Sequence, residues 1–251
     1  MPLKQSEAIV LRSYPLREAD LLVTFFTRQE GKVRGVARAA KKSQRRFGGA
    51  LEPLTYVRLY WDDRERHELA RIDSCDVLES PLTSQVDYPR AVALGHVAEV
   101  LDELLPDREP SDAVFRLALA VLMQLQPGTV WMPLTYFELW IARLTGLLPD
   151  LSACVVCGET LCGEALNGSR AYFHALVPEG LLCANDKRLA SSEMSSESRR
   201  LVGEMFRAPV ESFTGPWPRA RAADLRKYLV QLIERHIEKK LVTASMLERL
   251  E

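Results

Sequence analysis

Short apolar runs separated by turn signals dominate the first 80 residues, and this pattern is typical of a small β-domain. The runs are rich in β-branched and aromatic residues, which favour extended backbone. They cover residues 7–12, 21–27, 33–38, 55–61 and, more weakly, 66–77. Short strands at this density predict a small barrel or sandwich.

The apolar period changes near Pro81 and becomes helical from about Tyr88 onward. One apolar face extends from Val92 to Leu105, and Ser111 is placed to cap a second helix that ends at Gln126. Further periodic segments predict helices over residues 134–144, 195–206 and 222–241. Residues 149–190 show little periodicity and hold scattered glycines and most of the cysteines, so we expect a loop-rich module there. The fold class predicted is α+β, with a β-domain over 1–80, a helical domain over 81–148 and 191–251, and the module between its two parts.

The net charge of the chain restricts a nucleic-acid site to a local part of the surface. The 251 residues are 47% hydrophobic and 27% charged, with a net charge of −1, so a core can be buried but the whole molecule does not attract polyanions. No apolar run approaches the roughly 18 residues needed to span a bilayer, and the first residues lack the apolar core of a signal peptide. We therefore expect a cytoplasmic protein with no membrane role, in which any DNA contact comes from a local patch.

Such a patch is present between Gly31 and Leu51. This stretch holds seven cations and no acid. Phosphates would neutralise the mutual repulsion of these cations and release counterions, which gives salt-sensitive binding that is indifferent to sequence. The alternative is a solvated surface loop. The residues predicted to contact DNA are Lys32, Arg34, Arg38, Lys41, Lys42, Arg45 and Arg46.

Strand alternation refines this prediction. Lys32 and Arg34 share one face of a strand, opposite Val33. Residues 39–49 read as a mobile loop, in which Phe47 beside the arginines could stack on an exposed base.

The cysteines indicate a metal site. Cys154 and Cys157 have the spacing of a zinc knuckle, whose two sulfurs can reach one ion. A second knuckle would place a cysteine three residues after Cys183, but Asp186 stands there. The predicted ligands of a structural Zn²⁺ are Cys154, Cys157, Cys162 and Cys183, with Asp186 or His174 as possible replacements for Cys162. The competing interpretation is a degenerate site with free thiols.

Motifs of common enzymes are missing from the sequence. It contains no G-x-x-x-x-G-K-[ST] phosphate loop, no H-E-x-x-H and no H-x-E with P-C-x-x-C. We therefore expect a protein that uses no nucleotide, has no catalytic residues and handles nucleic acid without reacting with it.

Taken in order, several segments resemble the RecO family of bacterial recombination mediators. No single motif is diagnostic, but their order and spacing together are specific. They are Ala8-Ile9-Val10-Leu11, Arg17-Glu18-Ala19-Asp20, residues 27–32, residues 35–43, residues 146–158 and residues 236–241.

The resemblance implies an N-terminal OB-fold barrel, a C-terminal α-helical domain and a zinc-finger-like insertion. It also implies binding to single- and double-stranded DNA, annealing of complementary strands, and cooperation with RecR in loading RecA onto gaps coated with single-strand-binding protein, whose C-terminal tail is recognised. A nucleoid-associated location follows from these partners. The departure from a four-cysteine pattern at Asp186 bears on the metal and not on the fold.

Two other classes of function fit parts of the sequence. A thiol or zinc enzyme could be centred on Cys154 and Cys157. A scaffold that binds only proteins could use the helices around Tyr136 and Trp140 as a peptide groove, with the basic stretch incidental.

Overall fold

The computed structural model describes residues 3–63, 69–81, 86–161 and 170–250. The chain divides into two compact units. Unit 1 comprises Met1–Gly128 and Leu241–Glu251, and unit 2 comprises Thr129–Lys240. The boundary between the two compact units thus lies near residue 128, whereas the hydrophobic pattern of the sequence changes from strand-like to helical near residue 81.

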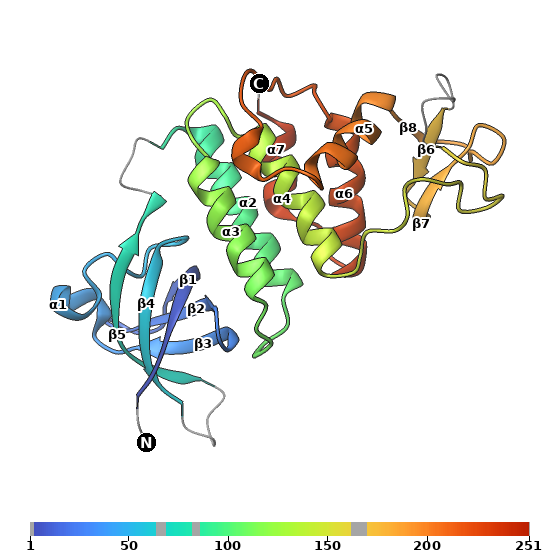
Figure 1. The fold of residues 1–251 in the computed structure, drawn as a ribbon. Helices are drawn as coiled ribbons and strands as arrows, with labels where there is room; N and C mark the ends of the chain where they lie inside the picture. Colours follow the sequence, from blue (N-terminus) through green and yellow to red (C-terminus); the bar gives the residue numbers. More distant parts are fainter. Residues whose placement is uncertain (1–2, 64–68, 82–85, 162–169, 251) are drawn as a thin grey trace. The chain divides into compact units, whose positions relative to one another are not determined.

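Unit 1 begins with a closed five-stranded barrel (Figure 1). Its strands follow one another in the order β1-β2-β3-β5-β4, and β1 pairs with β4 to close it. All pairs are antiparallel except β3 with β5, which is parallel. Two short helical turns, η1 (Ala40–Lys42) and α1 (Gln44–Phe47), connect β3 to β4. This is the OB-fold, a five-stranded Greek-key barrel. The strands are β1 (Lys4–Pro15), β2 (Leu21–Thr27), β3 (Gly31–Ala37), β4 (Tyr56–Asp62) and β5 (Ala70–Glu79).

The barrel interior is filled by alternate residues of each strand, as the period-two pattern predicts. Phe25, Leu59, Trp61 and Ile72 are among its fully buried side chains. Gly35 permits the close pairing of β3 with β5, because a Cβ there would lie 2.4 Å from a methyl group of Ile72 and 2.8 Å from the carbonyl oxygen of Ala70.

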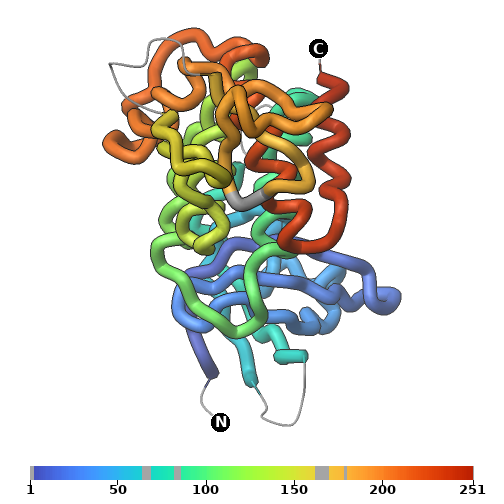
Figure 2. Tube along the Cα trace, turned by 90° about the vertical axis from the view of Figure 1, so that its right-hand side faces the viewer, coloured from blue at the N-terminus to red at the C-terminus, as the bar shows by residue number. Residues whose placement is uncertain are grey.

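Three helices complete unit 1: α2 (Tyr88–Leu104), α3 (Asp112–Gln124) and α7 (Val242–Glu248). Ser111 caps α3 as predicted, since its side chain accepts a hydrogen bond from the Val114 N–H. The last predicted helix differs from the structure. It ends at His236, Glu238 adopts a left-handed backbone with φ of 53°, and the chain then forms α7 as a separate helix against α2 (Figures 1 and 2).

Unit 2 contains helices α4 (Trp131–Leu144), α5 (Ser196–Met205) and α6 (Ala223–His236), with a short turn η4 (Val210–Ser212). A three-stranded sheet in the order β7-β6-β8 joins them. Its strands are β6 (Ala171–His174), β7 (Val177–Leu182) and β8 (Ser192–Met194). Tyr136 of α4 is buried, and the indole N–H of Trp140 donates to the Met205 carbonyl oxygen at 3.1 Å. Among the described residues, no helix is long and apolar enough to cross a membrane.

Candidate nucleic-acid interface and metal centre

Lys32 lies on the outer face of β3, as alternation predicts, but this part of the face is covered. Its side chain is only 6% exposed, and its Nζ donates to the Asp102 carbonyl oxygen at 2.6 Å. Its Nζ also lies 3.4 Å from the Asp107 carboxylate. The chain that follows α2 forms a bridge beside Lys32 and hides it from solvent. The prediction that Lys32 is open to solvent is therefore wrong. The segment that covers Lys32 is distant in the sequence, so the local hydrophobic pattern of β3 carries no signal of it.

Arg34 lies two residues further along β3 and is exposed. Its guanidinium lies 3.7 Å from the Asp107 carboxylate, at the surface. An exposed pair of this kind holds its partners weakly, so Arg34 remains accessible to an anion.

The basic segment, residues 38–46, follows β3 directly. Arg38, Lys41, Lys42 and Arg45 are exposed, and none of them forms an ion pair with another residue that the structure describes. Arg46 differs, because its guanidinium folds back and donates to the Arg38 carbonyl oxygen at 2.7 Å. The segment concentrates positive charge at one end of the barrel.

The conformation of the basic segment corrects two expectations. It forms the helical turns η1 and α1 where the sequence suggested a mobile loop. Phe47 is 3% exposed and belongs to the barrel core, so it cannot stack on a base. Burying Phe47 anchors the segment to the barrel, and the Arg46 guanidinium lies 5.0 Å from the centre of its ring.

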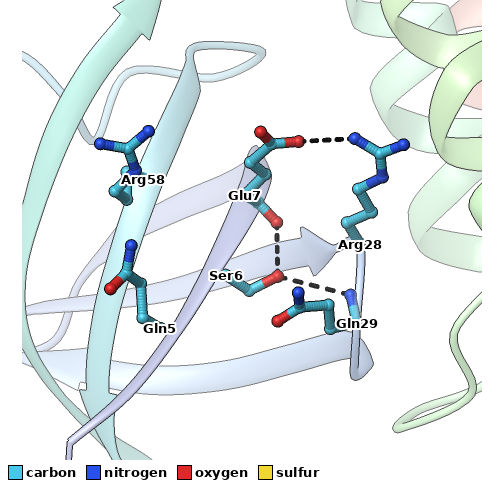
Figure 3. Close-up of a pocket in the computed structure, with 6 residues that line it drawn as sticks. All are labelled: Gln5, Ser6, Glu7, Arg28, Gln29 and Arg58. Atoms are coloured by element: carbon cyan, nitrogen blue, oxygen red, sulfur yellow. Dashed lines mark hydrogen bonds and ion pairs between the residues drawn. The ribbon is translucent and has the colours of Figure 1, made fainter.

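A polar pocket of about 420 Å³ opens elsewhere on the barrel (Figure 3). Glu7 and Arg28 face one another across it, with 2.9 Å between guanidinium nitrogen and carboxylate oxygen. Arg28 also pairs with Asp112 at 2.6 Å. The hydrogen bond from Arg28 lowers the pKa of the Glu7 carboxyl group, which stays ionised. Because two carboxylates neutralise Arg28, this pocket is a poorer anion site than the basic segment. Its lining residues are Gln5, Ser6, Glu7, Arg28, Gln29 and Arg58.

Two turns bring three cysteines of unit 2, Cys154, Cys157 and Cys183, together. The first holds Cys154 and Cys157, and it closes through a hydrogen bond from the Gly158 N–H to the Cys154 carbonyl oxygen at 2.9 Å. The second follows β7 and holds Cys183 and Asp186. A hydrogen bond of 2.9 Å from the Val155 N–H to the Leu181 carbonyl oxygen joins the two turns.

The four side chains form a group that could hold a metal ion. One ligand atom from each of Cys154, Cys157, Cys183 and Asp186 lies within 4.8 Å of all the others. The sulfurs of Cys157 and Cys183 are 3.7 Å apart. A tetrahedron with zinc–sulfur bonds of 2.3 Å has an edge of about 3.8 Å, so this spacing suits zinc. Asp186 occupies the fourth corner, with one oxygen 3.2 Å from the sulfurs of both Cys154 and Cys183.

Backbone amides tune these thiols. Burial raises the pKa of Cys154, but N–H groups of Cys157, Cys183 and Val156 point at its sulfur and the net pKa is lowered. Burial raises the pKa of Cys183 to about 12. Hydrogen bonds from Cys157, Cys154 and Cys183 lower the pKa of Asp186 and keep it ionised. A divalent cation can replace the thiol protons that this carboxylate now accepts.

The other candidate ligands have different positions. Cys162 lies outside the described residues. His174 hydrogen-bonds to the backbone of Leu176 and Leu189 and is not part of the four-residue group. Cys75 is a buried thiol of β5 in the barrel core, and burial raises its pKa. The sequence favours Cys162 as the fourth ligand and gives Asp186 as a replacement. The position of Asp186 three residues after Cys183 is the local signal that it lies beside the other three side chains.

Together these features define an OB-fold protein with a basic connection on the barrel, a helical C-terminal part and a cysteine-rich insertion. Comparison with known proteins agrees. A family model described as "Recombination protein O N terminal" matches residues 1–81, and one described as "Recombination protein O C terminal" matches residues 85–244. The chain therefore belongs to the RecO family of DNA repair proteins.

Individual relatives support this assignment over the whole chain. The DNA repair protein RecO of Koribacter versatilis is 70% identical over 250 residues, which cover 99% of this chain and 100% of the relative. The DNA repair protein RecO of an Anaeromyxobacter species is 32% identical, covering 96% of this chain and 94% of the relative. That of Geobacter metallireducens is 36% identical over 204 residues, covering 79% of this chain and 78% of the relative.

Proposed function

We propose that this chain is a DNA-binding recombination mediator. It binds single- and double-stranded DNA, anneals complementary single strands and, together with RecR, helps to load RecA onto gaps coated with single-strand-binding protein. The C-terminal tail of single-strand-binding protein is the contact that brings this chain to the gap. Membership of a DNA repair family and a cationic surface on an OB-fold barrel both support this role.

The observation that carries the proposal is the basic segment. Arg38, Lys41, Lys42 and Arg45 stand exposed on a chain whose net charge is −1, and no described residue pairs with them. Four cations this close repel one another, and phosphates relieve that repulsion while releasing counterions. Contacts to phosphates do not depend on the base sequence. A mediator that acts at any gap requires such sequence-independent binding.

The test of this surface is charge reversal at two exposed positions. Lys41→Glu with Arg45→Glu is expected to weaken single-strand binding at least tenfold at moderate salt, because two phosphate contacts become repulsive. The slope of log affinity against log salt should fall by roughly 1.4 or more in magnitude, at about 0.7 per lost contact with a single strand. Fluorescence anisotropy over a salt series measures both quantities.

A matched control removes the general effect of net charge. Arg116→Glu with Arg200→Glu makes the same change in charge on exposed helical residues that already pair with Asp112 and Glu204. This control should keep both affinity and slope. Equal losses in the two double variants, or none in the first, would remove the basic segment from the DNA surface. The same three proteins in a strand-annealing assay, with and without single-strand-binding protein, extend the test from binding to annealing.

We further propose that four side chains hold a structural Zn²⁺, namely those of Cys154, Cys157, Cys183 and Asp186. The ion would join the turn of residues 154–157 to the turn of residues 183–186, and its charge would stabilise the thiolates. Ligation by four protein groups leaves no open position for a substrate, so the site supports folding of the module.

A further inference from the structure

A row of side chains crosses the outer face of the barrel over four strands. The strand pairing aligns Tyr14 of β1 with Leu22 of β2, Leu22 with Val36 of β3, and Val36 with Arg71 of β5. Residues aligned in this way project from the same face. The row is therefore a continuous strip across neighbouring strands, of which β1, β2 and β3 lie side by side in Figure 1. We call Tyr14, Leu22 and Val36 the outer-face platform.

The platform is apolar but not sealed. Tyr14 is 49% exposed, although it is one of the largest side chains of the barrel. Leu22 and Val36 are half-buried beside it, in contrast to Val23 and Phe25 of the same hairpin, which are fully buried inside. An exposed aromatic ring beside two aliphatic side chains offers an apolar surface on which the face of a base can stack.

Cations surround the platform. Arg34 and Arg38 flank Val36 along β3 and just beyond it, and Arg71 ends the row on β5; all three are exposed. Aromatic side chains interleaved with arginines are the combination that holds unpaired nucleic acid, because bases stack while phosphates meet the charges. A purely apolar protein partner would gain nothing from these arginines and would have to desolvate them.

The Tyr14 ring is held in place. The Arg12 guanidinium donates to the Tyr14 hydroxyl oxygen at 2.9 Å. Arg12 is itself fixed by Asp102 at 2.5 Å and by Glu103 at 3.1 Å. A ring that is ordered before binding loses little conformational freedom on binding.

The platform is continuous with the basic segment. The Ala39 N–H donates to the Asp20 carboxylate at 2.8 Å, and the Lys41 N–H donates to the Ala19 carbonyl oxygen at 3.2 Å. These bonds tie the start of the basic segment to the β1–β2 turn, next to Tyr14. A strand whose phosphates follow Arg38 and Lys41 therefore brings its bases to the platform.

We infer that Tyr14 stacks on an unpaired base, so that the outer-face platform distinguishes single-stranded from duplex DNA. The inference rests on the proposed DNA-binding function and adds to it the residue that recognises the single strand. The faces of paired bases are hidden within the duplex stack. Duplex therefore meets the cations but not Tyr14.

The test compares Tyr14→Ala with Tyr14→Phe. Tyr14→Ala is expected to lose about 5- to 150-fold in affinity for a thymine oligonucleotide, the range for one base–aromatic stack. Its affinity for duplex, and for an abasic strand of equal length, should change less than about twofold. Tyr14→Phe retains the ring and should bind like the parent protein. An oligonucleotide carrying 2-aminopurine gives a direct readout, because stacking on Tyr14 quenches its fluorescence and Tyr14→Ala should restore it.

The outcomes separate this inference from the proposed function. If the parent protein binds DNA and Tyr14→Ala binds the thymine oligonucleotide equally well with 2-aminopurine still quenched, the platform is not the base site and the cationic surface stands. Equal losses on single strand, duplex and abasic strand would also overturn stacking. If the parent protein binds no DNA at low salt, the proposed function itself fails. Equal thermal unfolding of the three proteins, expected for a half-exposed position, shows that folding is unchanged.

Discussion

The barrel and the cysteine-rich module are both small β-structures, but different forces hold them together. The barrel encloses an apolar core that includes Phe25, Leu59 and Trp61. On one face of the module's sheet, Tyr172, Val177 and Leu182 form a small buried cluster, while Phe173 packs with its ring 5.4 Å from that of Tyr228 on α6. Burial stabilises at about 25 cal/mol per Å², so the larger apolar core favours the barrel, and the smaller cluster of the module gains more from a cross-link. The four-residue metal group lies where such a cross-link is needed.

This contrast assigns different roles to the two regions. Because the interior stabilises the barrel, its outer face and its connecting segments can hold charged residues. The basic segment and the outer-face platform lie in these outer parts. The polar groups of the module instead face one another, with three thiols and a carboxylate around one point. We therefore expect DNA contacts to be sensitive to substitutions on the barrel surface and the fold of the module to be sensitive to metal.

Metal removal is the strongest test of this contrast. Cys154→Ser, or chelation of the parent protein, should unfold the module, because zinc contributes about 10–16 kcal/mol to comparable zinc-finger peptides at neutral pH. Hydrogen exchange over residues 171–194 should become fast, while exchange in the barrel stays slow. Elemental analysis should find one zinc per chain in the parent protein and none in the variant.

Three further variants sharpen the metal test. Cys75→Ser alters a buried thiol of the barrel and should retain zinc. Asp186→Ala should lower zinc affinity, and Cys162→Ser, at the ligand position favoured by the sequence, should not. Loss of zinc in Cys162→Ser with retention in Asp186→Ala would show that the carboxylate is not the fourth ligand. Slow exchange in the module after complete chelation would contradict its dependence on metal.

A cavity in the barrel core tests the other half of the contrast. Phe25→Ala should destabilise unit 1 by about 3–5 kcal/mol, since Phe25 is completely buried and the barrel cannot collapse onto the space. Chemical denaturation monitored by circular dichroism measures the loss. Tyr88→Ala, at a position 62% exposed, is the control and should change stability by less than about 0.5 kcal/mol. Zinc content should be unchanged in both, and loss of zinc in Phe25→Ala would show that the regions do not fold independently.

The same contrast explains what could be predicted from the sequence. Strands β2, β3 and β4 agree with the prediction to within about two residues at each end, because alternation is a local consequence of one buried face. Charge clustering at residues 32–46 and the Cys154–Cys157 spacing are also local signals. The structure leaves most of these cations exposed and brings Cys154 and Cys157 together with Cys183 and Asp186.

Features that depend on distant segments escaped prediction. The segment that follows α2 buries Lys32, and the side chain of Phe47 turns inward and packs in the barrel core. The outer-face platform exists only in the pairing of four strands, so Tyr14 carries no signal of its own. Helix α7 was missed because its seven residues are too short for a clear period.

The smallest expected effect concerns how the C-terminal segment rejoins unit 1. Glu99 of α2 accepts hydrogen bonds of 2.9 Å from the N–H groups of Val242 and Thr243, at the start of α7. The Thr243 hydroxyl also donates to Glu99, so His96 must donate through Nδ1 to the Thr243 oxygen. Glu99→Gln removes the charge from these bonds and should destabilise unit 1 by about 1–3 kcal/mol.

The pH dependence of this variant identifies the cause. Burial raises the pKa of Glu99, but the hydrogen bonds from Thr243 and Val242 outweigh it and the pKa is lowered. A carboxyl group whose folded pKa lies below its unfolded value, which is about 4.3 for glutamate, stabilises fully above that value and loses its contribution as the pH falls through the folded pKa. The difference in unfolding free energy between Glu99→Gln and the parent protein should therefore be constant near pH 7 and shrink below about pH 4. Glu204→Gln, on an exposed helix pair, serves as the control with a change below about 0.5 kcal/mol. A Glu99→Gln difference that does not vary with pH would mean that packing, and not the carboxylate charge, holds α7 on α2.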